Sequence, residues 1–382
     1  MSAAGQPGGA LRVALLTPCF WPEVRRGGER LVRDLADGLI ARGHHPRLIT
    51  SHPGRPSKTL EDGLEIVRHW RPPPGRLARR KFEDHLTHLP FTYASLALGH
   101  DDVAHAVYVT DAVAAARWSK KSGRPSIHGV IGAPDRQYFV RRRKRVELWV
   151  EACRDCDVVT VLSKAAADNL WRDLGVESRV IAPGVDTSVF TPGETPERDE
   201  RPTIFCASAI DDPMKRVGLL VEAFALVRRE RPDARLLLNR PRDTALAGQV
   251  TGNDGVELLD AASRSPELIG AYRRSWVCAL PSLGEAFGLV LAEALACGTP
   301  VVGSNAGGIP EVLGGRDDVG RLFDERTPEA LSRALLDGLE LAEDDGVRER
   351  CRARGEELSL ENCVAEYESL YRELIAARAR AG

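Results

Sequence analysis

The 382-residue sequence lacks any apolar run that approaches the roughly 18 residues needed to span a bilayer. The N-terminal stretch that ends in Leu11-Arg12-Val13 also lacks the apolar core of a signal peptide. Hydrophobic residues make up 43% and charged residues 28%, which is ordinary for a globular chain and excludes a disordered or fibrous one. We therefore expect a soluble, cytoplasmic protein that is long enough for two domains of about 150 residues or more.

The sequence has almost no net charge of either sign, because its 53 Lys and Arg are balanced by 55 Asp and Glu. The charges are unevenly distributed, since residues 1–190 hold 29 Lys and Arg against 21 Asp and Glu. Two basic stretches stand out in that half, residues 68–81 and residues 141–145. A surplus this small gives nucleic acid little weight as a partner. Peripheral contact with anionic lipid at the inner face of a membrane stays open, although solvated charge is the commoner account of such stretches.

The eight cysteines lack a disulfide-like pattern, and most lie inside apolar runs, as buried reduced thiols do. Cys153 and Cys156 form a single CxxC, with no second pair or nearby histidine to complete four zinc ligands. Asp155 and Asp157 resemble a metal-binding DxD motif, but in that motif the acids follow a strand, whereas here a strand follows them. The sequence therefore predicts structural cysteines and no metal site.

Short β-rich apolar runs alternate with amphipathic helices, a pattern typical of parallel sheets covered on both faces. The expected strands are residues 12–17, 46–50, 64–69, 103–109, 126–130, 158–162, 179–182, 203–209, 234–239, 255–259, 276–281, 300–303 and 320–323. Helices are expected in the second half at residues 217–230, 266–274, 286–296 and 327–342. We therefore predict an α/β fold of two Rossmann-like, doubly wound domains that face a central cleft, where the carboxyl ends of the strands meet.

The expected domains are residues 1–186 and residues 202–358. Between them, residues 187–201 are rich in Pro, Gly and acids and poor in apolar residues, which predicts a linker that contributes to neither core. Residues 359–382 are expected to form a terminal helix that packs back toward the N-terminal domain. The apolar stripe of this helix consists of Val364, Tyr367, Leu370, Tyr371 and Ile375.

The most informative segment, residues 282–304, is interpreted as a strand end, a tight turn, a helix and the next strand. Glu285 lies in the turn, and Glu293 follows eight residues later inside the expected helix, about 12 Å along its axis at 1.5 Å per residue. One ligand could therefore contact both carboxylates. A carboxylate accepts two hydrogen bonds at once, so Glu293 could bind both ribose hydroxyls of a sugar nucleotide while Glu285 holds its sugar.

Between the two glutamates, the amides of Ala286, Phe287 and Gly288 are expected to form the first turn of the helix, with Leu289 next. Unpaired N–H groups and the positive end of the helix dipole favour a diphosphate there, and Gly288 lets it approach closely. The alternative is a solvated Glu285 and a second glutamate favoured only by the dipole. For two glutamates considered without their surroundings, that alternative would prevail.

The whole segment closely resembles the E-x7-E block of family 4 glycosyltransferases (glycosyl transferases group 1), which have the GT-B fold and use retaining chemistry. Further matches to this family lie in both halves of the chain, at residues 22–28, 161–163, 181–186 and 305–311. The resemblance implies an enzyme without a cofactor, which moves a hexose-type sugar from a UDP- or GDP-linked donor to an acceptor hydroxyl. Because the sequence has no metal motif, we expect this enzyme to work without divalent cations. The acceptor, a small molecule, a glycan or a lipid-linked compound, is expected to bind the N-terminal domain.

The resemblance also assigns roles to individual residues. Gly27 and Gly28 match the turn that faces the donor diphosphate and the acceptor, and they do not form a GxGxxG fingerprint. His128 is interpreted as the end of the short strand RPSIH, and it resembles the histidine that family members direct toward the donor sugar. Lys215 matches the lysine that binds the diphosphate, where its charge would stabilise the leaving group. Glu285, His128 and Lys215 are thus the expected catalytic residues.

Two positions depart from the family pattern. The arginine that usually precedes the lysine by six positions is Ala209 here, and the glycines usual near Arg240 are missing. Arg216 or Arg240 could supply the second cation, although a solvated arginine is the default account of each. Two other functions therefore remain: a catalytically silent protein that binds sugar nucleotides, and a nucleotide-sugar epimerase of the same fold.

Overall fold

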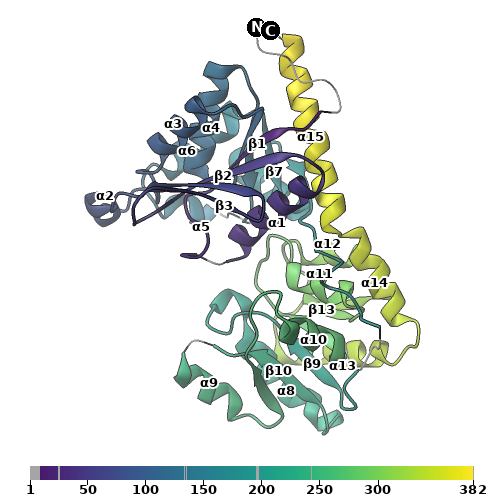
Figure 1. The fold of residues 1–382 in the computed structure, drawn as a ribbon. Coiled ribbons are helices and arrows are strands. Elements are labelled where there is room, and N and C mark those ends of the chain that lie inside the picture. The colour runs from purple at the N-terminus through teal and green to yellow at the C-terminus, as the bar shows by residue number, and fades with distance from the viewer. Residues whose placement is uncertain are drawn as a thin grey trace. The chain divides into compact units, whose positions relative to one another are not determined.

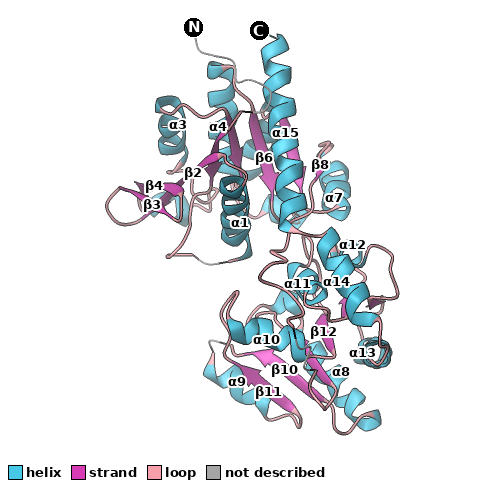
Figure 2. Cartoon of the chain, turned by 45° about the vertical axis from the view of Figure 1, so that its right-hand side comes forward, coloured by secondary structure: helices cyan, strands magenta, loops and turns pink. Residues whose placement is uncertain are grey.

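The computed structural model describes residues 9–24, 26–132, 134, 136–194, 198–241 and 243–381. The chain divides into two compact units, Met1–Ala182 with Cys363–Gly382, and Pro183–Asn362. Each unit is an α/β domain in which helices flank one sheet (Figures 1 and 2). The first unit ends at Ala182 rather than at residue 186, and residues 187–201 belong to the second unit. Within the described ranges, no helix combines the length and the apolar composition that crossing a bilayer requires.

An eight-stranded sheet forms the centre of the first unit, in the order β3-β4-β2-β1-β5-β6-β7-β8. All neighbouring strands are parallel except β3 and β4. The strands are β1 Arg12–Leu16, β2 His45–His52, β3 Ser57–Glu61, β4 Leu64–Trp70, β5 Val103–Ala106, β6 Ser126–Val130, β7 Val158–Val161 and β8 Arg179–Val180. Seven of the eight were therefore expected from the sequence.

The unexpected strand, β3, is the antiparallel partner of β4 at the edge of the sheet. Asp62 and Gly63 form the turn between the two strands with positive φ angles of 50° and 83°, as a two-residue type I′ turn requires. Because β3 is largely exposed, it needs no apolar face, and the alternation that predicts the other strands is missing. The Asp-Gly pair was the only local signal of this hairpin.

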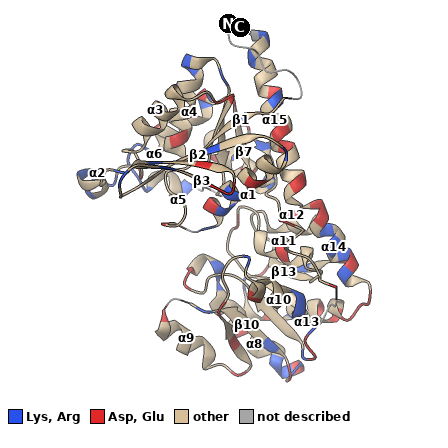
Figure 3. Ribbon diagram, viewed as in Figure 1, with Lys and Arg blue, Asp and Glu red and all other residues tan. Residues whose placement is uncertain are grey.

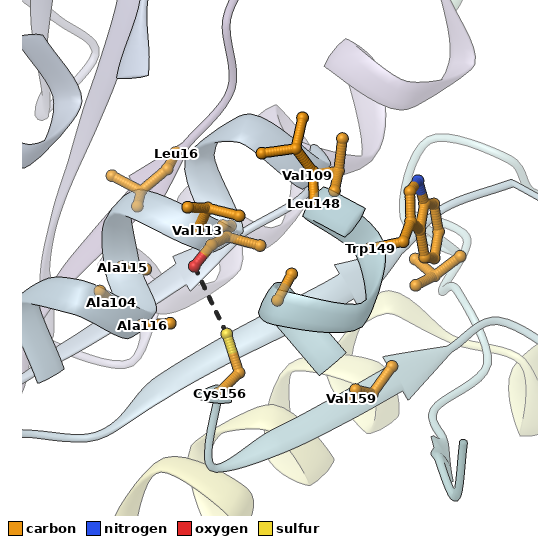
Figure 4. Packing of buried hydrophobic residues seen from close by; sticks show 14 of the residues in the cluster. Leu16, Ala104, Val109, Val113, Ala115, Ala116, Leu148, Trp149, Cys156 and Val159 are labelled. Atoms are coloured by element: carbon orange, nitrogen blue, oxygen red, sulfur yellow. Dashed lines mark hydrogen bonds between the residues drawn. The ribbon is translucent and has the colours of Figure 1, made fainter. Parts of the chain in front are cut away.

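The helices of the first unit are α1 Gly27–Ala41, α2 Gly75–Arg79, α3 Leu89–Leu98, α4 Val109–Ser122, α5 Arg136–Val140, α6 Arg145–Asp155, α7 Lys164–Leu174 and most of α15 Leu360–Ala381. A large buried cluster joins α4 and α6 to the sheet, and Figure 4 shows part of it. In this cluster the Cys156 thiol donates to the Ala112 carbonyl at 3.5 Å, so that cysteine lies in the core.

Helix α15 packs on the first unit through the apolar residues that its sequence spacing singled out. Val364, Leu370 and Tyr371 are buried, and the Tyr371 hydroxyl lies 2.8 Å from Nδ1 of His105 on β5. At Gly38 on α1, an added Cβ would lie 2.4 Å from Cγ2 of Val364, so the two helices are in close contact. The chain therefore returns to its first unit after completing the second.

The second unit has a six-stranded, fully parallel sheet in the order β11-β10-β9-β12-β13-β14. Its strands are β9 Thr203–Cys206, β10 Arg235–Asn239, β11 Val256–Leu259, β12 Val277–Leu280, β13 Val301–Ser304 and β14 Gly320–Phe323. Its helices are the short 3-10 helix η1 Pro213–Lys215, α8 Val217–Glu230, α9 Thr244–Thr251, α10 Pro266–Arg274, α11 Leu289–Ala296, α12 Ile309–Leu313, α13 Pro328–Ala342 and α14 Val347–Glu357. This is the order of a doubly wound sheet that reverses between β9 and β12.

The expectation that residues 187–201 contribute to neither core is wrong at Phe190. Its side chain is fully buried, and its ring meets that of Tyr272 at a steep angle, with 6.0 Å between centroids. The Asp199 carbonyl in the same segment accepts a hydrogen bond from the indole of Trp276 at 2.8 Å. A segment of polar composition can therefore be bound tightly through one aromatic residue and its backbone.

Candidate functional site

The carboxyl ends of β9 and β12 lie next to each other in the second unit, because these strands are parallel neighbours. Loop 207–216 follows β9, and loop 281–288 follows β12. A hydrogen bond of 2.9 Å from the Leu283 amide to the Met214 carbonyl joins the two loops. Ligands of doubly wound sheets bind at this edge, where the strand order reverses. The two loops are therefore the natural location of a binding site.

Lys215 and Glu285, which the sequence places 70 residues apart, are in direct contact across these loops. The Lys215 Nζ lies 2.5 Å from Oε1 of Glu285, and the Ser282 hydroxyl donates to the same oxygen at 2.9 Å. Both charged side chains remain partly exposed. The structure thus brings together two of the three expected catalytic residues and adds Ser282, which sequence analysis did not single out.

The loop after β13 also contacts the backbone of Glu285. The Gly308 amide donates to the Glu285 carbonyl at 2.9 Å. At Gly307, where φ is 58°, an added Cβ would lie only 2.4 Å from that carbonyl oxygen, and at Gly308 it would lie 2.5 Å from the Ala286 carbonyl. Both positions therefore require glycine. The segment 305–311 was noticed in the sequence as a family match, but no role followed from the match alone.

The expected helix at 286–296 begins later, at Leu289. Gly288 is its N-cap and has a φ of 114°, which residues with a Cβ rarely adopt, so Ala286 and Phe287 lie in the preceding loop. The expectation that the amides of Ala286, Phe287 and Gly288 form the first helical turn is therefore wrong. The N–H groups of the first helical turn instead begin with those of Leu289 and Val290. The expected displacement of about 12 Å between the glutamates assumed helical rise over all eight residues, but only Leu289 to Glu293 lie in the helix.

Glu293 lies inside the second unit with only 1% of its surface exposed. Its Oε2 accepts a hydrogen bond of 2.8 Å from the hydroxyl of Tyr272 on α10. Burial, and next the nearby Glu293 charge, raise the pKa of Tyr272 well above its ordinary value, so the tyrosine stays a donor. Glu293 thus has a firm partner within the protein. The hypothesis that Glu293 binds ribose hydroxyls stays a proposal.

The two arginines considered as the second cation have different surroundings. Arg216 is the N-cap of α8, with a φ of 52°, and its guanidinium donates to the Arg326 carbonyl at 3.3 Å. Arg240 forms an exposed ion pair of 2.7 Å with Asp260 after β11. Arg216 directly follows Lys215 in the chain, so it is the better placed of the two to add positive charge beside that lysine.

In the first unit, His128 is the third residue of β6 and does not end the strand, which continues to Val130. The interpretation of His128 as a strand end is therefore wrong. Its ring is almost completely buried, 5.0 Å from that of Trp149, and Nδ1 lies 3.9 Å from the thiol of Cys153. Burial lowers the pKa of His128 to about 4, so the imidazole is neutral near pH 7.

Gly27 and Gly28 are the first two residues of α1, as expected for a glycine turn that opens a helix after the first strand. An added Cβ at Gly28 would lie 2.5 Å from Cδ1 of Ile131, so the loop after β6 comes close to this helix start. The Glu29 carboxylate accepts from the Arg26 amide at 3.0 Å and occupies the first turn of the helix. A phosphate at this position would therefore have a carboxylate nearby.

Cys153 and Cys156, which form the CxxC sequence, were expected to be structural residues. Burial raises the pKa of both Cys153 and Cys156 to about 12, so neither thiol is a thiolate near pH 7. Within the part of the chain that the structure describes, no three His, Cys, Asp or Glu side chains gather in a way that could hold a metal ion. Cys153 and Cys156 therefore have the surroundings of structural residues.

Comparison with known proteins places these features in a family. Residues 25–189 match the model of Glycosyltransferase Family 4, and residues 201–340 match that of Glycosyl transferases group 1. The MMP alpha-(1->4)-mannosyltransferase of Mycolicibacterium hassiacum is 32% identical over 232 residues, which are 58% of this chain and 51% of that protein. The chain thus aligns with about half the length of this curated relative.

Solved structures share the fold at low sequence identity. Sucrose-phosphate synthase from Thermosynechococcus elongatus has a TM-score of 0.77 and 22% identity, with 96% of this chain and 100% of the other covered. Anabaena HepE in complex with UDP and glucose has a TM-score of 0.70 and 16% identity, with 95% and 100% covered. These likenesses, with one sheet in each unit, show that the chain has the GT-B fold. The two family models show that the chain belongs to the family 4, group 1 glycosyltransferases.

Proposed function

We propose that the protein is a retaining glycosyltransferase that takes a hexose-type sugar from a nucleoside diphosphate donor bound at the strand ends of the second unit. The observation that carries this proposal is the contact of Lys215 with Glu285, supported by Ser282 and by the glycine loop after β13. A cation for a leaving diphosphate and a carboxylate for sugar hydroxyls are thereby held at one site. The complexes of HepE with UDP and glucose support a nucleotide-sugar donor as the ligand class.

In the proposed reaction the bond between the anomeric carbon and the diphosphate breaks, and an oxocarbenium-like sugar forms. The acceptor hydroxyl attacks from the same face and gives its proton to the leaving phosphate. No protein nucleophile is required, so Glu285 orients and stabilises the sugar. Lys215 and the N–H groups that begin α11 offset the charge of the leaving group, which lets the enzyme work without a divalent cation.

The experiment that tests this proposal is a thermal shift assay of the full chain against UDP, GDP and their common sugar derivatives. A ligand at 100 times its Kd stabilises the folded state by about 2.7 kcal/mol, which gives a clear rise in the melting temperature. The best ligand is then used as a donor, and nucleoside diphosphate release is measured with and without candidate acceptors and with a chelator. If no sugar nucleotide raises the melting temperature, the proposal fails.

A matched pair of variants locates the site. Lys215→Ala removes the cation before α8, whereas Arg231→Ala removes one at the other end of the same helix, where Arg231 pairs with Glu343 at 3.0 Å. Only the first change should reduce the shift caused by the donor. Equal losses in the two variants would place the nucleotide elsewhere.

The second candidate is a silent sugar-nucleotide-binding protein, which the missing cation at Ala209 favours. The Lys215 charge is paired with Glu285, and no second cation stands at position 209 to assist a leaving diphosphate. This candidate predicts the same thermal shift without any donor turnover. An epimerase would instead convert the donor in the absence of an acceptor.

A further inference from the structure

Two basic segments that are far apart in the sequence lie together on the first unit. Phe82 and Arg143 form a parallel β-bridge. The Glu83 amide donates to the Arg143 carbonyl at 2.9 Å, and the Arg143 amide donates to the Lys81 carbonyl at 2.7 Å. The segment that contains α2 is therefore tied by its backbone to the segment between α5 and α6. We call the combined face, formed by residues 75–84 and 136–147, the basic surface.

The basic surface carries far more positive than negative charge. Its two segments contain ten Lys and Arg against three Asp and Glu. All three acids already have partners: Glu83 pairs with Arg145 at 2.5 Å, Asp84 with Arg142 at 3.2 Å, and Glu147 with Lys144 at 3.2 Å. Among the described residues no ion pair forms with the other cations, which are Arg76, Arg79, Arg80, Lys81, Arg136, Arg141 and Arg143. In Figure 3 part of the α2 ribbon is blue, the colour of Lys and Arg.

A buried ion pair holds this surface in place. The guanidinium of Arg145 and the carboxylate of Glu83 are almost completely enclosed, and the Tyr108 hydroxyl donates to Glu83 at 3.3 Å. The Arg145 guanidinium also lies 4.0 Å from the centre of the Tyr138 ring. Because these contacts join the two segments and neutralise one cation, the remaining cations lie on one folded face.

Aliphatic side chains are exposed beside these cations. Val140 at the end of α5 is 75% exposed, and Val146 and Val150, one turn apart on α6, are 42% and 46% exposed. Of the aromatic residues nearby, Phe139 and Trp149 are buried, and Phe82 and Tyr138 are half-buried, each with an arginine guanidinium over its ring. Single-stranded nucleic acid stacks its bases on exposed aromatic rings, whereas a membrane interface is bound through apolar residues next to Lys and Arg. The composition therefore favours lipid.

We propose that the basic surface adsorbs to a bilayer that contains anionic phospholipids. The cations attract the lipid phosphates, and the exposed valines enter the boundary between headgroups and acyl chains. Each Lys or Arg near an anionic bilayer contributes about fivefold to the binding constant. This proposal is independent of the donor site, since none of its residues belongs to the second unit.

The test is flotation of the full chain with phosphatidylcholine vesicles, with and without phosphatidylglycerol. We expect binding only with phosphatidylglycerol, and we expect high salt to abolish it because the exposed charges are screened. Arg76→Ala with Arg79→Ala, and separately Arg141→Ala with Arg143→Ala, should each weaken binding about 25-fold, with additive effects when combined. If only one of the two double variants loses binding, the two segments do not act as one surface.

A matched control removes two exposed lysines of the same unit outside the basic surface, Lys121→Ala with Lys164→Ala. Equal loss in this control would show attraction by net charge alone and would overturn the proposal. So would tighter binding of the chain to an RNA oligonucleotide than to the vesicles, with the same variants weakening it. A melting curve of each variant establishes that it is folded, and its donor-induced thermal shift keeps this result separate from the proposed function.

Discussion

Replacing Gly307 with alanine should disable the site while leaving its charged residues intact. The new Cβ would lie 2.4 Å from the Glu285 carbonyl oxygen, and ordinary contacts of this kind begin at 3.4 Å. The Glu285 backbone and the loop after β13 must therefore separate by about 1 Å, which disturbs the position of Glu285. A displacement of that size at a reacting centre costs about a hundredfold in rate. Position 307 also has a φ of 58°, which costs a residue with a Cβ about 1–2 kcal/mol of folding free energy.

Gly315→Ala is the control that separates these two effects. Gly315 has a φ of 75°, so alanine is strained there too, but no heavy atom lies within 4 Å of the added Cβ. In urea unfolding Gly315→Ala should lose only the cost of the φ strain, and Gly307→Ala should lose more because the clash adds to it. Only Gly307→Ala should lose kcat for nucleoside diphosphate release from the best donor, by about a hundredfold. If kcat stays within about twofold of the control, the position of Glu285 does not govern turnover, and the reasoning is refuted.

Three other changes test separate contacts. Lys215→Ala removes a charged hydrogen-bond donor worth about 2 kcal/mol, so calorimetry should show roughly thirtyfold weaker binding of the best sugar nucleotide. Unchanged affinity for that donor would remove Lys215 from the site. Tyr272→Phe removes the hydroxyl that donates to the enclosed Glu293 oxygen at 2.8 Å. Urea titrations should show a free energy of unfolding lowered by about 1–3 kcal/mol. No change would mean that water replaces the hydroxyl. Burial lowers the pKa of His128 from 6.5 in the unfolded chain to about 4 in the folded protein. The neutral imidazole therefore contributes stability that is fully present above pH 6.5 and is lost as the pH falls toward 4. His128→Gln should therefore reduce the loss of stability between pH 7 and pH 5 by about 2 kcal/mol, and an unaltered pH profile would contradict the burial argument.

Local sequence signals predicted the six strands of the second unit and its helices α8, α10, α11 and α13, but they missed α9, α12 and α14. Helices α8 and α10 have the expected bounds, 217–230 and 266–274. Helix α10 is delimited by Ser265, whose hydroxyl accepts from the Leu268 amide, and by Pro266 in its first turn. Such caps are properties of a few adjacent residues, so they can be recognised without knowledge of the tertiary structure.

The start of α11 illustrates what local signals miss. The run from Ala286 to Ala296 has high helix propensity apart from one glycine, and propensity alone extends the helix to its beginning. The loop after β13 instead binds the backbone of Glu285 and approaches Ala286, so these residues cannot join the helix. Tertiary contacts thus decide the conformation at the position where the chemistry is proposed. The burial of Glu293 against Tyr272 is non-local in the same sense and was not foreseen.

The placement of Glu285 has a consequence for the charge available to a donor. Lys215 faces a carboxylate at 2.5 Å, so the two side chains together contribute no net charge to an approaching diphosphate. A sugar whose hydroxyls bind Glu285 would draw that carboxylate into new hydrogen bonds and leave the ammonium group to the phosphates. Binding of the complete sugar nucleotide should then exceed that of the nucleoside diphosphate alone, since only the former separates the pair. The missing cation at Ala209 makes this coupling more important here than in a site with two cations.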